Sequence, residues 1–156
     1  MPVRSRYPQR IEYRAESVWD GKTGGTAIAS EGRSIIFDTP KSYGGRGTGI
    51  CPDELFVCAV LGCLNNTFLD FQRRFEMGLV SIGLKGYSIA AFEDGAYRIQ
   101  SVKVSGEIVV GEDELETGKR CLELMKEYCH LSRSIGPCIP VEFDIVVREA
   151  TASGTK

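Results

Sequence analysis

The chain has 156 residues, of which 42% are hydrophobic and 26% are charged. These values are close to those of globular domains, so composition excludes the disordered and fibrous classes and predicts one domain over residues 1–156. Lys and Arg number 19 against 21 Asp and Glu, so the net charge of −2 provides no positive field for nucleic acid or an acidic membrane. The longest apolar run, residues 55–64, is shorter than the roughly 20 residues of a membrane-spanning helix. We therefore expect neither nucleic acid nor a membrane as a partner.

The first residues carry charge without the apolar stretch of a secretory signal, so the cytoplasm is the expected location. In a reducing compartment, each of the six cysteines would be a buried apolar residue, a metal ligand or a redox thiol. Residues 1–9 and 150–156 are expected to be mobile ends.

The N-terminal third predicts three strands followed by a loop. Side chains alternate from Arg10 to Trp19 with the period of a half-buried strand. Two β-rich segments, Thr26–Ser30 and Ser34–Asp38, flank a turn at Glu31–Arg33, which indicates a meander. The segment Asp38–Ile50 contains a proline and four glycines, which is typical of a flexible loop that can carry function.

A long helix is predicted over Pro52–Met77, because proline is favoured at the first helical position and Gly78 follows the last turn. Residues 55–64 are apolar on every side of this helix, which indicates burial all round. One sheet covers only one side of a helix. A second subunit is the simplest cover for the other side, so the sequence predicts a homodimer.

Two further strands form a predicted hairpin, Leu79–Phe92 and Tyr97–Val110, joined by a turn that contains Asp94-Gly95. The apolar phase of the second strand changes along its length, so we expect a β-bulge near Ser101.

A second helix is predicted from Asp113, with Glu116 completing a capping-box variant, to about Arg133. The alternating segment Val141–Val147 predicts a last strand. The order is βββ–α–ββ–α–β, which predicts an α+β fold with a mostly antiparallel sheet.

Cys63 and Cys129 fall on the two predicted helices, and both are expected to face the interior. They could form a disulfide if their Cα atoms come within roughly 7 Å, whereas the alternative is that each packs as a small apolar residue. Polar side chains lie within about one helical turn of each thiol, namely Asn65, Asn66 and Thr67 on one side and His130, Ser132, Arg133 and Ser134 on the other. Such donors lower the pKa of a thiol, which favours the redox interpretation.

The other cysteines are expected to be structural. Cys58 and Cys121 are assigned to the core, and Cys51 and Cys138 to the surface or to strand ends. The sequence has no Cys-x-x-Cys pair and a single histidine, His130, which argues against a zinc site. We interpret His130 as a polar residue near the end of a helix.

The sequence resembles the OsmC/Ohr family of osmotically inducible and organic hydroperoxide resistance proteins. The resemblance rests on Gly49–Leu55, on Leu61-Gly62-Cys63 with Thr67, and on Glu127–Ser132. It implies an intertwined homodimer in which sheets from both subunits enclose two central helices. It also implies a reaction that needs no cofactor or metal.

By this resemblance Cys63 is the peroxidatic cysteine and Cys129 is the resolving cysteine, and a dithiol reduces the resulting disulfide. The family places a carboxylate directly after the proline, and this carboxylate holds the arginine that stabilises the thiolate. The matching position is Asp53, where Glu is usual. The cation corresponds either to Lys22, in an early Gly-Lys-Thr-Gly turn, or to Arg46 in the glycine-rich loop.

The expected function is therefore a thiol-dependent peroxidase that reduces organic hydroperoxides or hydrogen peroxide. Two alternatives use the same fold. One is a non-catalytic module that binds a small apolar ligand, and the other is a redox sensor in which the disulfide alters a partner surface.

Overall fold

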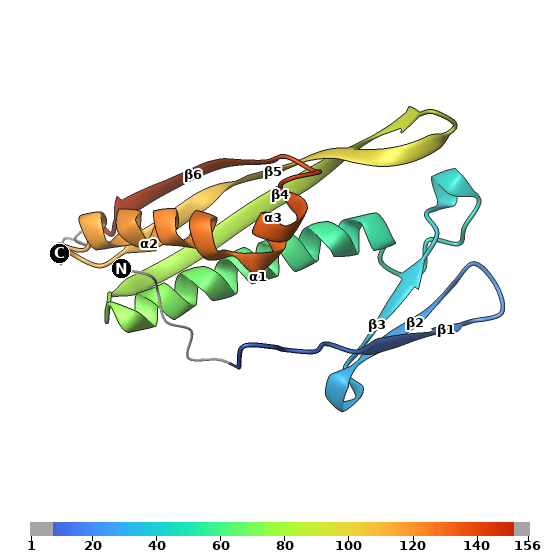
Figure 1. Ribbon diagram of the computed structural model, residues 1–156, viewed down its shortest axis with the longest axis horizontal. Helices are drawn as coiled ribbons and strands as arrows, with labels where there is room; N and C mark the ends of the chain where they lie inside the picture. Colours follow the sequence, from blue (N-terminus) through green and yellow to red (C-terminus); the bar gives the residue numbers. More distant parts are fainter. Residues whose placement is uncertain (1–7, 152–156) are drawn as a thin grey trace, which may run out of the picture. The chain divides into compact units, whose positions relative to one another are not determined.

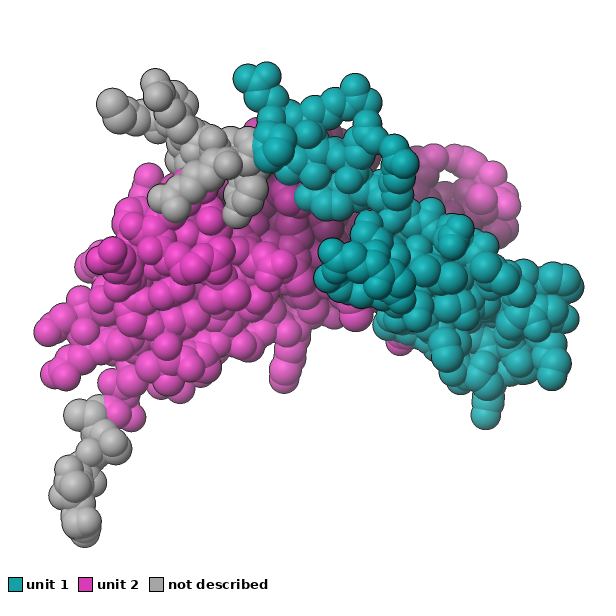
Figure 2. Space-filling view, turned by 90° about the horizontal axis from the view of Figure 1, so that it is seen from below, with its two compact units in different colours: residues 1–52 teal, residues 53–156 magenta. Residues whose placement is uncertain are grey.

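The computed structural model describes residues 8–151, and the chain divides into two compact units, residues 1–52 and 53–156 (Figure 2). Most of the two ends that the sequence predicts to be mobile lie outside the described residues. The single domain over residues 1–156 stays a prediction, and each unit is described by itself below.

Unit 1 is built on a three-stranded antiparallel sheet in the order β1-β2-β3 (Figure 1). The strands are β1 (Ala15–Trp19), β2 (Gly24–Ala29) and β3 (Ser34–Asp38). The predicted meander is therefore confirmed, although β1 begins five residues later than Arg10. Two short 3₁₀ turns follow β2 and β3, η1 (Ser30–Gly32) and η2 (Lys41–Tyr43), and η2 lies inside the predicted loop.

The long helix α1 (Pro52–Arg74) leads from unit 1 into unit 2. Acidic residues occupy its first turn and Arg73 and Arg74 its last, as the helix dipole favours. Its buried side chains form one stripe at helical spacing, namely Val57, Val60, Leu64, Phe68 and Phe71. The prediction of burial on every side is wrong for the single chain, because Cys58, Ala59 and Gly62 are exposed.

By length and mean hydropathy, α1 could cross a membrane. No membrane span was predicted from the sequence, because the uninterrupted apolar run covers only residues 55–64. A core helix of a soluble protein meets the same criterion. The buried stripe of α1 packs in the core of unit 2, as a core helix does.

The sheet of unit 2 has the order β4-β5-β6. Its strands are β4 (Leu79–Glu93), β5 (Ala96–Val110) and β6 (Val141–Glu149). β4 and β5 form the predicted antiparallel hairpin, whereas β6 runs parallel to β5. The chain reaches β6 through a helical crossover, and such a connection allows parallel pairing (Figure 1). The strand pairing is mostly antiparallel, as predicted, but the strands form two three-stranded sheets, one antiparallel and one mixed, rather than one sheet.

The predicted β-bulge is present in β5. Ile89 pairs with Ser101 and Ala90 pairs with Ile99, so Gln100 is the extra residue. A one-residue shift moves side chains to the other face of a strand. The bulge therefore restores the apolar alternation that the sequence interrupts at this point.

The second helical region is two helices, α2 (Leu115–Tyr128) and α3 (His130–Ile135), rather than the predicted single helix from Asp113 to Arg133. Cys129 separates them, because its ψ of 111° is extended. The predicted capping box is also wrong, since Asp113 has a φ of 62° and the residue before α2, Glu114, makes no side-chain capping hydrogen bond.

Residues from α1, α2 and the inner face of the sheet form the core of unit 2. Its largest fully buried side chains include Phe68, Leu64, Met77, Ile108 and Met125. Gly118 allows α2 to approach the sheet closely. A Cβ at this position would lie 2.8 Å from Cγ1 of Val110 and 2.9 Å from Cγ1 of Val147.

We predict that Gly118→Val destabilises the protein by about 1–3 kcal/mol, because the added side chain overpacks the contact between α2 and the sheet. Urea unfolding followed by circular dichroism measures the change. Lys119→Ala, on the exposed side of the same turn, is the matched control and should change the unfolding free energy by at most about 0.5 kcal/mol. Equal stability of the two variants would contradict the close approach.

Candidate redox site

The structure brings Cys63 and Cys129 together in unit 2. Their Sγ atoms lie 3.3 Å apart, and the Cys129 thiol donates a hydrogen bond to the Cys63 sulfur. Cys63 lies in the middle of α1 and is half-buried, whereas Cys129 lies at the break between α2 and α3 and is fully buried. Two thiols on separate segments are thus positioned to form a disulfide with little movement.

Polar groups of the protein surround the Cys63 sulfur. The backbone N–H of Leu131, in the first turn of α3, hydrogen-bonds to it, and the hydroxyl of Thr67 lies beside it. The Thr67 hydroxyl also lies 2.8 Å from the Cys63 carbonyl oxygen, to which it can donate. On the other side, the Ser132 hydroxyl donates to the carbonyl of Cys129 at 3.2 Å. The helix break at Cys129 therefore positions both a thiol and a backbone donor beside Cys63.

Burial raises the pKa of the Cys63 thiol above its ordinary value, and the adjacent Cys129 adds to the rise. The Leu131 N–H and the Thr67 hydroxyl act in the opposite direction, because hydrogen bonds to the sulfur favour the thiolate. Burial has the larger effect. Burial therefore favours the neutral thiol of Cys63, and the two donors favour the thiolate when one forms.

The remaining cysteines lie apart from this pair. Cys121 is buried as predicted, and burial, reinforced by the charge of Glu114, raises its pKa to about 11. Cys58 is exposed, so its assignment to the core is wrong. It lies outside the stripe of α1 that the sheet and α2 cover. Cys138 is exposed, in keeping with the prediction, and Cys51 is half-buried.

Arg46, one of the two predicted cations, belongs to a hydrogen-bonded cluster within unit 1. Its guanidinium pairs with Asp20, and its Nε lies 3.8 Å from Oδ2 of Asp38. The Thr23 hydroxyl accepts hydrogen bonds from the Arg46 backbone N–H at 3.2 Å and from Nε at 3.1 Å. The glycine-rich loop that carries Arg46 is therefore held against the turn between β1 and β2 and against the end of β3.

Asp38, which sequence reasoning did not identify as functional, is the centre of this cluster. Its buried carboxylate accepts hydrogen bonds from the Thr23 hydroxyl at 2.6 Å and from the Thr39 N–H at 2.8 Å. It also accepts from the hydroxyl of Thr48 at 2.6 Å and from its N–H at 2.9 Å. These donors, with the Thr23 hydroxyl first, hold the Asp38 pKa far below its usual range. In the sequence, the only sign of this role is that threonines occupy positions 23, 39 and 48, before and after Asp38.

Lys22 and Asp53, the other predicted site residues, lie at the surface. Lys22 lies in the turn between β1 and β2, where its N–H donates to Asp20 and its carbonyl accepts a hydrogen bond from the Trp19 indole. Asp53 and Glu54 lie in the first turn of α1. The cations Lys22 and Arg46 belong to unit 1, and the two thiols belong to unit 2.

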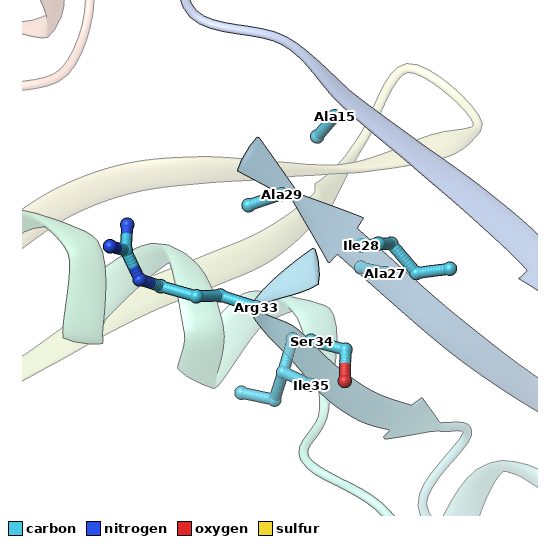
Figure 3. A pocket seen from close by; sticks show the side chains of 7 residues that line it. All are labelled: Ala15, Ala27, Ile28, Ala29, Arg33, Ser34 and Ile35. Carbon is cyan, nitrogen blue, oxygen red and sulfur yellow. The ribbon is translucent and has the colours of Figure 1, made fainter. Parts of the chain in front are cut away.

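Within residues 8–151, no group of three or more His, Cys, Asp or Glu side chains is arranged to hold a metal ion. His130, the only histidine, is the exposed first residue of α3. An open depression of about 250 Å³ lies on the sheet of unit 1 (Figure 3). Its lining is largely apolar and contains no cysteine, with Ala15, Ala27 and Ala29 contributing methyl groups and Arg33 the one charge.

Comparison with known protein families identifies one that matches this chain. The profile of the family described as OsmC-like protein matches residues 45–144, which include both thiols and Arg46. The chain therefore belongs to the OsmC-like protein family. No curated protein matches the sequence.

Solved structures share the fold at low sequence identity. An OsmC-like protein from Mycoplasma pneumoniae is 15% identical with a TM-score of 0.75, and the match covers 88% of this chain and 97% of that one. A putative organic hydroperoxide resistance protein from Vibrio cholerae, with captopril in one active site, is 18% identical with a TM-score of 0.70, covering 90% and 96%. An organic hydroperoxide resistance protein from Legionella pneumophila is 14% identical with a TM-score of 0.68, covering 92% and 100%. These matches establish the α+β architecture that the sequence predicted.

The low pKa of Asp38 predicts a specific dependence of stability on pH. The unfolded carboxyl, with a pKa near 3.8, binds a proton before the folded one does, so acid favours unfolding. The stabilisation is complete above this value and is lost as the pH falls toward the lower folded pKa. From about pH 5 to about pH 2, the unfolding free energy of Asp38→Asn should therefore decrease less steeply than that of the wild type.

Denaturant unfolding at a series of pH values measures this slope. Thr48→Val removes one hydroxyl donor but keeps the carboxyl, so its slope should lie between those of the wild type and Asp38→Asn. If Asp38→Asn has the slope of the wild type, the carboxylate is not the linked group.

Proposed function

We propose that this chain is a cytoplasmic thiol-dependent peroxidase that reduces organic hydroperoxides or hydrogen peroxide. Cys63 is the peroxidatic cysteine and Cys129 the resolving cysteine. The single observation that supports this best is the 3.3 Å contact between the two sulfurs, with a backbone N–H directed at the sulfur of Cys63. Membership of the OsmC-like family, together with the organic hydroperoxide resistance proteins among its structural neighbours, supports the same reaction class.

Cys63 is more exposed than Cys129, so a hydroperoxide reaches the Cys63 sulfur first. The Cys63 thiolate attacks the outer oxygen of the hydroperoxide, an S–O bond forms, the O–O bond breaks, and the leaving oxygen takes a proton to become an alcohol or water. The Cys129 thiol then attacks the sulfenic acid, so that an S–S bond forms and water leaves. A dithiol reductant returns both sulfurs to the thiol state by exchange.

Burial opposes the first step, because it favours the neutral thiol of Cys63. A cation near the sulfur would offset this cost. Arg46 is our candidate, because a guanidinium can contact the sulfur and the leaving oxygen at the same time, and Lys22 is the second candidate. Asp53 would be the carboxylate that holds the cation at the site.

The apolar surface of α1 supports a homodimer. Cys58 and Ala59 are exposed between the buried residues Val57 and Val60, and Gly62 is exposed one turn further on. These exposed residues are small and largely apolar, like those of a protein core, so a second copy of the chain could cover them as part of an interface. The intertwined dimer would then enclose α1 between sheets of both subunits.

We expect reduced wild-type protein to form one Cys63–Cys129 disulfide when it is mixed with one equivalent of an organic hydroperoxide, and to turn over when a dithiol is present. Cys63→Ser should lose turnover by at least about 100-fold, as expected when a nucleophile is removed. Peptide mass spectrometry identifies the linkage, and peroxide consumption measures the rate.

Cys121→Ser is the matched control, because it removes a buried thiol outside the pair. Cys129→Ser should accumulate Cys63 sulfenic acid, which a sulfenic-specific reagent detects. Peroxide consumption that survives in Cys63→Ser would contradict the assignment. Rapid disulfide formation without turnover would favour a redox sensor, and an unreactive Cys63 would favour a binding module.

The homodimer predicts that Ala59→Glu changes the oligomeric state, because it would bury an unpaired charge in the interface. Sedimentation velocity should show a dimer for the wild type and a larger monomer fraction for the variant. Lys119→Glu places the same charge on the exposed side of α2 and should remain dimeric. A wild-type protein that sediments as a monomer at all concentrations would exclude the dimer.

A further inference from the structure

We propose that the reduced Cys63–Cys129 pair is a chelating site for trivalent inorganic arsenic, which it binds as arsenous acid. The inference uses the thiols of the proposed peroxidase but does not require their turnover. Three properties of the pair point to this ligand class: the distance between the sulfurs, the number of ligands and the charge of the site.

The distance between the two sulfurs indicates the sulfur–atom–sulfur angle of an atom that is bound to both of them. Two bonds of about 2.3 Å, the length of zinc–thiolate bonds, place their sulfurs about 4.6 Å apart in a linear arrangement and about 3.8 Å apart at a tetrahedral angle. The same bonds give about 3.3 Å when the angle is close to a right angle. The observed separation is 3.3 Å. A pyramidal, three-coordinate atom with a lone pair has such an angle, and trivalent arsenic is an atom of this kind that binds sulfur.

The number of ligands points the same way. Structural zinc sites take four protein ligands, and catalytic sites take three. Residues 8–151 contain no cluster of three or more metal-ligating His, Cys, Asp or Glu side chains, so around this pair two sulfurs are the available set. Arsenous acid needs only two, because it can keep one hydroxyl as its third substituent.

The charge of the site is the third property. A metal ion binds thiolates, so the protein must release two protons and bury a charged centre. Burial of this pair opposes ionisation, because a charged thiolate loses hydration when it is removed from water. Arsenous acid is neutral at pH 7 and reacts with neutral thiols. Two As–S bonds form and two As–O bonds break. The two thiol protons leave in two water molecules, and no atom is oxidised or reduced.

The exposure of the two thiols determines where the hydroxyl that remains on arsenic lies. Cys129 is fully buried and Cys63 is half-buried, so the remaining hydroxyl must lie on the Cys63 side. Arsenic in this position covers the sulfur that a hydroperoxide would reach. Bound arsenite should therefore protect the pair from oxidation, and a disulfide should prevent arsenite binding.

The test is the binding of sodium arsenite to full-length protein that has been reduced and then freed of reductant. Native mass spectrometry and equilibrium dialysis with arsenic analysis give the stoichiometry and affinity. We expect one arsenic per wild-type chain. Cys63→Ser and Cys129→Ser should each bind about 100-fold to 10,000-fold more weakly, because the second bond is no longer intramolecular.

Cys121→Ser and Cys58→Ser are controls that remove one buried and one exposed thiol outside the pair, and both should bind as the wild type does. Circular dichroism establishes that each variant is folded, and wild type oxidised to the disulfide provides a second comparison without any substitution. The oxidised protein should not bind arsenite. Zinc should bind reduced wild type no more tightly than it binds Cys129→Ser.

Arsenite binding that is unchanged in Cys63→Ser or Cys129→Ser, or in the oxidised protein, would overturn the proposal. Zinc binding that needs both thiols and is as tight as arsenite binding would overturn it as well. Hydroperoxide turnover measured without arsenite separates the two proposals. An active peroxidase that binds no arsenite contradicts only this inference, and an inactive protein that holds one arsenic contradicts only the proposed function.

Discussion

The interruption of helical structure at Cys129 is the constraint on which the candidate site depends. One residue with an extended ψ ends α2, begins α3 and carries a thiol. The same interruption directs the Leu131 N–H at the sulfur on α1. A continuous helix would use this amide in an internal hydrogen bond with the carbonyl four residues earlier. The break therefore provides both the Cys129 sulfur and a donor that favours the thiolate of Cys63.

Unit 1 is organised by a comparable single group. The carboxylate of Asp38 accepts four hydrogen bonds, one from the turn between β1 and β2 and three from residues that follow β3. A buried carboxylate is stable only when its oxygens are satisfied in this way. The loop that carries Arg46 is therefore an ordered part of the unit in spite of its four glycines. A rigid loop can position a cation more accurately than a flexible one.

Periodic patterns made much of the fold predictable. The strands, the hairpin, the bulge and α1 each follow from a local alternation or a turn signal. The break in the second helix was not predicted, because the residue after Cys129 is His130, and histidine, unlike proline, does not interrupt a helix. The exposure of Cys58 was missed because an uninterrupted apolar run does not reveal which side the rest of the chain covers. The parallel pairing of β6 depends on the crossover, which strand periodicity does not encode.

The two thiols were predictable as candidates because each combines an apolar helix face with nearby polar residues. Their separation was not, since it depends on how α1 and the break after α2 pack together. Asp38 was not identified because its donors come from positions 23, 39 and 48, which only the folded chain brings together. Contacts of this kind are long-range and leave no periodic trace in the sequence.

The unequal exposure of the two sulfurs gives the pair a direction. A small reagent from solvent meets Cys63 first, because Cys63 is half-buried whereas Cys129 has no accessible surface. The inner sulfur is thereby kept from successive oxidation to sulfinic and sulfonic acids, which would destroy it irreversibly. The difference in burial therefore directs irreversible oxidation to the outer sulfur, Cys63, before the inner one.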